Sequence, residues 1–126
     1  MRMTLTTLLV ADYDAAIAFY VQAVGFSLRE NTDLGGGKRW VVVGPAAGGA
    51  GLLLAKAADC AQSARIGDQA GGRVMFFLQT DDFARDHARM TVAGVRFAEA
   101  PRHEAYGTVA VFEDLYGNRW DLIQPA

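Results

Sequence analysis

The fold is decided by Val111-Phe112-Glu113-Asp114-Leu115-Tyr116-Gly117-Asn118-Arg119-Trp120-Asp121-Leu122-Ile123-Gln124. Two apolar runs flank Tyr116-Gly117-Asn118, a triplet whose glycine and asparagine tolerate the positive φ of a tight turn. The pattern predicts two strands joined by that turn. The second run contains a single carboxylate, Asp121. A lone acid in an apolar strand either faces a ligand or belongs to a structural ion pair.

Composition limits the class of protein. The chain has 126 residues, 52% of them hydrophobic and 21% charged, which is typical of a single globular domain with its own core. A formal charge of −2 gives no reason to expect nucleic acid or an anionic membrane as a partner. One cysteine, Cys60, excludes an intrachain disulfide framework and a cysteine-based zinc cluster. With no recognisable signal peptide or membrane-spanning run, we expect a cytoplasmic protein.

The first half of the chain predicts a strand, a helix and three further strands. Asp12 is suited to cap the helix and Gly25 to end it. Between them, apolar residues at helical spacing form one face, namely Tyr13, Ile17, Tyr20 and Val24. The expected strands cover residues 5–10, 26–32, 38–43 and 52–55, with a hairpin tip at Gly35-Gly36-Gly37.

The second half predicts the same order of elements. Asp81 or Asp82 caps a helix whose buried face carries Phe83, His87 and Met90, and Gly94 ends it. The expected strands cover residues 74–78, 95–97, 108–112 and 119–124, with a polar loop at 101–106. Residues 57–72, rich in Ala, Gly, Gln and Ser, read as a linker with a helical turn near 59–64.

The two halves are related by an internal repeat. An offset of 69 residues superposes seven identities at expected caps, helix ends and strand centres. We interpret this as a duplicated βαβββ unit, with modules at about 4–56 and 73–125 in a single domain. The identical pairs are Leu9 with Leu78, Asp12 with Asp81, Ala15 with Ala84, Gly25 with Gly94, Glu30 with Glu99, Val42 with Val111, and Leu53 with Leu122.

These motifs resemble the vicinal oxygen chelate superfamily, which includes glyoxalase I, extradiol dioxygenases, fosfomycin-resistance transferases and bleomycin-binding proteins. The resemblance rests on Val10-x-Asp12, on Ala-Ile-x-Phe-Tyr20 with Val-Gly-Phe26, and on Glu113-Asp-x-x-Gly-Asn-x-Trp-Asp-Leu-Ile123. It implies an α+β fold in which two paired βαβββ modules form an open curved sheet, or cup, with helices on the outer face. It also implies a homodimer and a small organic ligand.

The resemblance also allows a prediction about metal binding. Enzymes of this superfamily place His, Gln or Glu ligands on the first and last strands of each module. The matching positions here are Leu5, Met75, Leu52 and Asp121, with Thr6, Val74, Gly51 and Leu53 as neighbours. Only Asp121 offers a ligand, and a divalent ion needs several oxygen or nitrogen donors. We therefore expect no metal and no other cofactor.

The remaining positions predict a mostly apolar binding cup. Period-2 alternation places side chains of the first and last strands on one wall, and Arg39 with Trp40 could stack on a flat ligand at its mouth. Asp121 either binds a ligand group or pairs with Arg119, Arg39 or Arg73. The predicted ligand-binding residues are Leu5, Thr7, Arg39, Trp40, Met75, Phe77, Gln79, Tyr106, Arg119 and Asp121.

Three functional hypotheses stay open at this point. The favoured one is a metal-independent small-molecule binder of the glyoxalase/bleomycin-resistance type. The second is a glyoxalase-like lyase or isomerase, or a dioxygenase-related enzyme, with a degenerate metal site at Asp121 or acid–base chemistry by His103 and Glu104 near Tyr106. The third is a dimerisation module without a ligand. His87 is expected to pack rather than to react.

Overall fold

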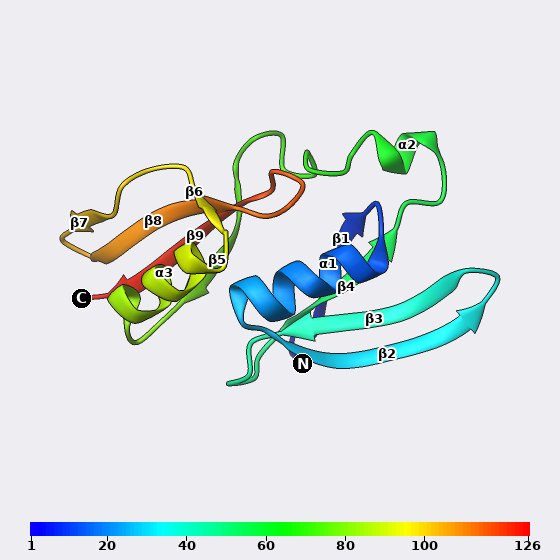
Figure 1. The fold of residues 1–126 in the computed structure, drawn as a ribbon, viewed down its shortest axis with the longest axis horizontal. Helices are drawn as coiled ribbons and strands as arrows, with labels where there is room; N and C mark the ends of the chain where they lie inside the picture. The colour runs from blue at the N-terminus through cyan, green and yellow to red at the C-terminus, as the bar shows by residue number, and fades with distance from the viewer. The chain divides into compact units, whose positions relative to one another are not determined.

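The computed structural model describes residues 1–126 and confirms the mixed α+β fold. The chain forms two compact units, Met1–Ile66 and Gly67–Ala126, whose boundary falls inside the predicted linker. Each unit contains one open sheet, and neither sheet closes into a barrel (Figure 1). None of the helices has the length and apolar character that crossing a membrane requires.

The first unit is built on a four-stranded sheet in the order β1-β4-β3-β2, with β1 parallel to β4 and the other neighbours antiparallel. This is the predicted βαβββ arrangement, followed by the predicted helical turn in the linker. Its elements are β1 (Leu5–Val10), α1 (Tyr13–Ile17), the π-helical segment η1 (Ala18–Val24), β2 (Ser27–Gly35), β3 (Lys38–Gly44), β4 (Gly51–Lys56) and α2 (Cys60–Ser63).

The predicted helix after β1 is confirmed, although its second part winds as a π-helix. The Asp12 carboxylate caps it by accepting the Ala15 N–H at 2.7 Å, and Gly25 ends it with a φ of 96°. Tyr20, in the π-helical part, is fully buried and stacks on Phe26 with ring centroids 5.8 Å apart. The spacing of apolar residues predicts the buried face but does not distinguish π from α winding.

Contacts of Arg39 show which face of the first sheet the helix covers. The Arg39 guanidinium pairs with Asp14 of α1 and lies over the Tyr13 ring, so the Arg39 side chain lies on the helix side. Side chains alternate along a strand and paired residues share a face, which puts Val41 and its partner Leu54 on that side too. Both are fully buried. We call the other side, turned away from the helix, the open face.

The second unit repeats this design with a five-stranded sheet in the order β5-β9-β8-β6, to which β7 adds by pairing with β8. The expected loop at 101–106 is wrong, because three of its residues form β7. Asp82, rather than Asp81, caps α3 by accepting the Arg85 N–H at 3.0 Å. The elements are β5 (Val74–Gln79), α3 (Phe83–Val92), β6 (Arg96–Phe97), β7 (Arg102–Glu104), β8 (Gly107–Glu113) and β9 (Arg119–Pro125).

An aromatic core joins α3 to the second sheet. The Phe83 N–H donates to Gln124 Oε1 at 2.8 Å, which places Gln124, and by alternation Trp120, on the helix side of β9. Phe112 is fully buried there, 5.7 Å from the Trp120 ring. His87 packs between Phe83 and Phe97, with centroid distances of 5.4 and 4.1 Å, which confirms its predicted packing role.

The predicted turn between β8 and β9 is held by a buried acid. The Asp114 carboxylate accepts the backbone N–H groups of Tyr116 and Asn118, each at 2.9 Å, and the Asn118 side-chain amide at 2.8 Å. Gly117 alone in this turn has a positive φ, of 91°. Since Asp121 follows three residues after Asn118, the turn sets the register of the strand that carries it.

The repeat holds, but its single offset of 69 is wrong at the first and last strands of each unit. Leu8 pairs with Leu54 in the first unit, and Leu78 pairs with Leu122 in the second, all in equivalent helix-facing places. Leu8 therefore corresponds to Leu78, an offset of 70, and Leu54 to Leu122, an offset of 68. A shift of one residue exchanges the two faces of a strand. The counterpart of Asp121 on the open face is consequently Leu53.

Candidate ligand-binding site

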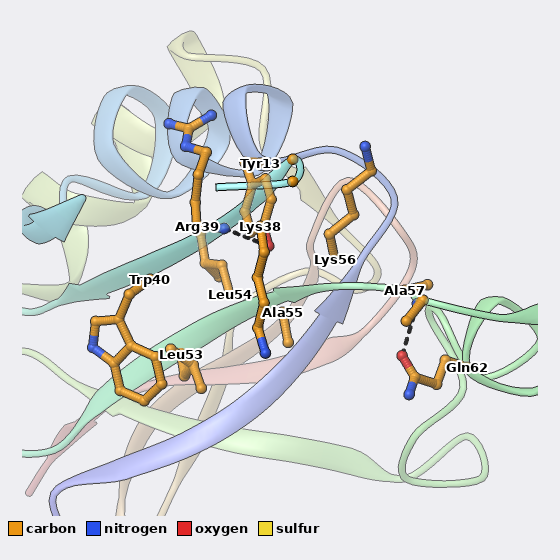
Figure 2. Close-up of a pocket in the computed structure, with 13 residues that line it drawn as sticks. Tyr13, Lys38, Arg39, Trp40, Leu53, Leu54, Ala55, Lys56, Ala57 and Gln62 are labelled. Carbon is orange, nitrogen blue, oxygen red and sulfur yellow. Dashed lines mark hydrogen bonds between the residues drawn. The ribbon is translucent and has the colours of Figure 1, made fainter. Parts of the chain in front are cut away.

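A cavity of about 530 Å³ lies in the first unit, where β3 and β4 separate (Figure 2). The two strands pair from Val43 with Leu52 to Val41 with Leu54. Beyond Val41, the start of β3 and the end of β4 stand on either side of the cavity. The tip of the β2–β3 hairpin closes one end, where Gly36 has a φ of 63° that suits glycine. The volume is in the range of small-molecule sites.

Trp40 provides the aromatic surface of this cavity. It lies on the open face of β3 and is 37% exposed. Leu53 and Ala55 of β4 line the same cavity and lie on the same face as Trp40 by alternation. Figure 2 shows the indole beside Leu53, whereas Arg39 is directed toward the opposite side. An apolar wall with an accessible indole suits a flat organic molecule.

Arg39 lines the cavity but its guanidinium is already engaged. It donates to the Asn31 amide oxygen from Nε at 3.1 Å and from Nη2 at 3.0 Å. It also pairs with Asp14 at 2.9 Å and lies 5.1 Å from the centre of the Tyr13 ring. Arg39 thus has a structural role in fixing α1 against β3, and its stacking on a ligand stays a prediction.

The linker contributes the far edge of the cavity. Asp59 caps α2 by accepting the Gln62 N–H at 2.8 Å, and Gln62 Oε1 in turn accepts the Ala58 N–H at 2.8 Å. These bonds hold the segment after β4 in a fixed turn, and Ala58 and Gln62 both line the cavity (Figure 2). Sequence reasoning assigned the helical turn but not its place in a site.

A second, more open cavity of about 480 Å³ lies on the open face of the second unit. Phe77, which is 69% exposed, and Asp121 are neighbours there because they pair in the β5–β9 register. Arg73 and Arg119 also line this cavity. The ion pair considered for Asp121 is not formed, and its Oδ1 is buried without a hydrogen bond from the chain.

Burial raises the pKa of the Asp121 carboxyl above its usual value. The positive charge of Arg102 opposes this shift, and the negative charge of Glu99 adds to it. Arg102 is itself shared with two acids, since it pairs with Glu99 at 3.0 Å and with Glu104 at 3.2 Å. Asp121 is thus an acceptor that its own sheet leaves unsatisfied, at a cost to the folded state.

Replacing Asp121 by asparagine is expected to stabilise the protein by about 1 kcal/mol at pH 7. A carboxyl whose pKa is raised by folding ionises first in the unfolded state, so stability falls as pH rises from about 4 through the raised pKa. The variant loses this decline. Denaturant unfolding between pH 4 and 7 measures it, with the exposed Asp68→Asn as control. Equal pH profiles for Asp121→Asn and the parent would contradict the assignment.

The other predicted ligand-binding residues are distributed between the two units. Leu5 and Thr7 lie exposed on the open face of β1, and Gln79 lies exposed at the end of β5. Met75 lies at a register irregularity of β5, beside a small cavity that Arg119 also lines. Tyr106 is exposed at the β7–β8 turn, with its hydroxyl 3.5 Å from Arg102 Nη1.

His103 and Glu104, which are neighbours in β7, have separate partners. His103 Nδ1 lies 3.2 Å from Thr108 Oγ1, whereas Glu104 pairs with Arg102. Neighbouring residues in a strand point to opposite faces. The two groups therefore do not face each other as an acid–base pair would.

The residues do not fit the divalent ion of the superfamily enzymes. Leu52, taken from sequence as a match to a ligand position, is 5% exposed on the helix side, so the matching position is Leu53. Across from Leu53 and Asp121 on the open faces lie Thr7 and Phe77. No group of three or more His, Cys, Asp or Glu side chains is placed to hold a metal ion.

Comparison with known proteins places the chain in a family. The family model for the Glyoxalase/Bleomycin resistance protein/Dioxygenase superfamily matches residues 2–122. An uncharacterized protein of Shewanella frigidimarina is 56% identical over 93% of this chain and 88% of its own length. The uncharacterized protein YurT of Bacillus subtilis is 30% identical over 98% of this chain and 99% of its own length. The chain belongs to the glyoxalase/bleomycin resistance protein/dioxygenase superfamily.

Two solved structures are similar over nearly the whole chain. TnmS3, an antibiotic-binding protein from Streptomyces sp. CB03234, has a TM-score of 0.83 and 30% identity, covering 100% of this chain and 97% of its own. UcmS2 has a TM-score of 0.84 and 31% identity, and the match covers 98% of this chain and 97% of UcmS2. The fold of this chain is thus shared with a protein that binds an antibiotic.

Sequence reasoning missed one feature of the first-unit cavity. The chain has only two lysines, Lys38 and Lys56, and both line it. No local pattern around Lys38 or Lys56 indicates that the two line one cavity. The one available signal was the rarity of lysine, since the chain has two lysines and ten arginines.

Proposed function

We propose that this protein binds a planar small organic molecule without a metal, in the cavity beside Trp40. The observation that carries this proposal is an accessible indole in a wall of apolar side chains, at a gap between paired strands. Similarity to TnmS3, described as antibiotic binding, supports a binding rather than a catalytic role. The poor fit of the donor residues to a divalent ion supports independence from metal.

The proposal is tested with N-phenyl-1-naphthylamine, an uncharged aromatic probe, on protein treated with a chelator. We expect saturable binding that quenches tryptophan fluorescence. Energy transfer to the probe reaches both tryptophans, so the quenching gives the affinity, and the Trp40→Ala variant shows whether the probe lies against the accessible Trp40. Calorimetry gives the stoichiometry, and addition of Zn²⁺ or Mn²⁺ is expected to leave the affinity unchanged.

Trp40→Ala is expected to weaken binding of the same probe about tenfold, because stacking on an indole contributes roughly 1 kcal/mol beyond the buried area. Val92→Ala, which removes an exposed apolar side chain on α3, serves as control and is expected to bind normally. Binding that requires added metal, or that Trp40→Ala leaves intact, would count against the proposal.

A further inference from the structure

Both lysines of the chain are collected in one cavity without a neutralising acid. Lys38 begins β3 and Lys56 ends β4, and no Asp or Glu is among the lining residues. Neither lysine forms an ion pair in the structure. The third cation, Arg39, is paired with Asp14. The lining of the cavity therefore contains two ammonium groups and no acid to pair with them.

The lysines reach the cavity from two sides. Lys38 and Trp40 are two residues apart in β3, so both side chains belong to the open face. Figure 2 shows Lys38 extending past Ala55, while Lys56 is directed to the side of Arg39 and Tyr13. Lys38 is thus the ammonium group on the same face as the indole. Lys56 contributes a second charge from the end of β4.

This combination selects for ligand charge. An indole face binds any flat aromatic ring, whereas an ammonium group in a partly apolar cavity favours an anionic oxygen and disfavours another cation. Lysine acts as a mobile point charge on four methylenes, which suits an acidic group of variable position. Glutamine at either position would keep the packing and remove the charge.

We propose that the first-unit cavity binds planar aromatic molecules that carry an anionic substituent, with Trp40 as the stacking surface and Lys38 as the direct counter-ion. Lys56 strengthens the positive potential at longer range. This inference rests on the proposed function, since it defines the ligand class of the same cavity. It excludes flat cationic compounds as preferred ligands.

The test compares 8-anilinonaphthalene-1-sulfonate with N-phenyl-1-naphthylamine, which has the same ring system without the sulfonate. On the full chain, calorimetry is expected to show about tenfold tighter binding of the sulfonate at low salt. This preference is expected to shrink as ionic strength rises. Lys38→Gln is expected to weaken sulfonate binding about fivefold, and Lys56→Gln about twofold, with the uncharged probe unaffected.

Arg2→Gln, which removes a charge from the exposed N-terminal segment, is the matched control and is expected to bind both probes normally. Equal affinities for the two probes on the parent protein would overturn the inference and leave the proposed function standing. An equal loss in Lys38→Gln and Arg2→Gln would overturn the counter-ion assignment. Failure of both probes to bind would overturn the proposed function and the inference together.

Discussion

Asp114→Ala is expected to lower the free energy of unfolding by about 3 kcal/mol. The buried carboxylate accepts three hydrogen bonds, two from backbone N–H groups and one from the Asn118 amide. Alanine removes the acceptor and leaves these donors unpaired inside the protein, where water reaches them poorly. Denaturant unfolding followed by far-UV circular dichroism measures the loss.

Asp33→Ala is the control for this substitution. Asp33 accepts a single backbone hydrogen bond from Gly35 at 2.8 Å in the exposed tip of the β2–β3 hairpin. Its loss is expected to cost about 0.5 kcal/mol, because water replaces the acceptor. Similar costs for the two substitutions would show that the β8–β9 turn is not held by Asp114.

Phe112→Ala is expected to destabilise the protein by roughly 3–5 kcal/mol, the range of aromatic deletions in a packed core. Phe112 is fully buried on the helix side of β8, next to Trp120 and Phe97 at 5.7 Å each. Removing its ring leaves a cavity that neighbouring rings fill only in part. Urea unfolding of the purified variant gives the value.

The matched substitution is Phe77→Ala, in the same sheet but on the open face. Phe77 is 69% exposed, so its removal is expected to change stability by less than about 0.5 kcal/mol. The pair tests the assignment of faces in the second unit. A large cost at Phe77 with a small one at Phe112 would mean that the register is shifted by one residue.

Helices and their ends were the most predictable part of the fold. Asp12 and Gly25 bound the first helix, and Gly94 follows the second, because caps and left-handed ends depend on local backbone chemistry. The strands followed from runs of β-branched and aromatic residues. β7 was missed because Arg102, His103 and Glu104 carry no apolar alternation, and its pairing with β8 is set by the turn that follows.

For the first and last strands of each unit, the face on which each side chain lies was less predictable than the presence of the strand. Identities at a constant offset matched Leu9 with Leu78, yet the irregularity between Val74 and Phe76 shifts β5 relative to that frame. In apolar strands a one-residue slip still aligns hydrophobic residues, so the sequence does not reveal it. A separate slip in the opposite direction, between β4 and β9, placed Leu52, a core residue, among the expected metal positions.

Part of the candidate site followed from residue type and part did not. Asp121 was singled out as a lone acid among apolar neighbours, and Trp40 as an indole next to Arg39 at the start of a strand. Arg39 of β3 contacts Asn31 of β2 and Asp14 of α1, and no local pattern indicated these contacts between separate elements. The sequence also does not show that pairing between β3 and β4 ends at Val41. The separation of the two strands beyond this point creates the cavity.

The placement of both lysines has a practical consequence for biosensor work. Amine coupling attaches a protein to a sensor surface through lysine side chains and the N-terminal amine. Here Lys38 and Lys56 are the only lysines, and both line the cavity. Coupling through them would attach the molecule to the surface by the proposed binding site and mask the interaction under study. Immobilisation through the single exposed thiol of Cys60, or capture by a C-terminal tag, keeps both ammonium groups free.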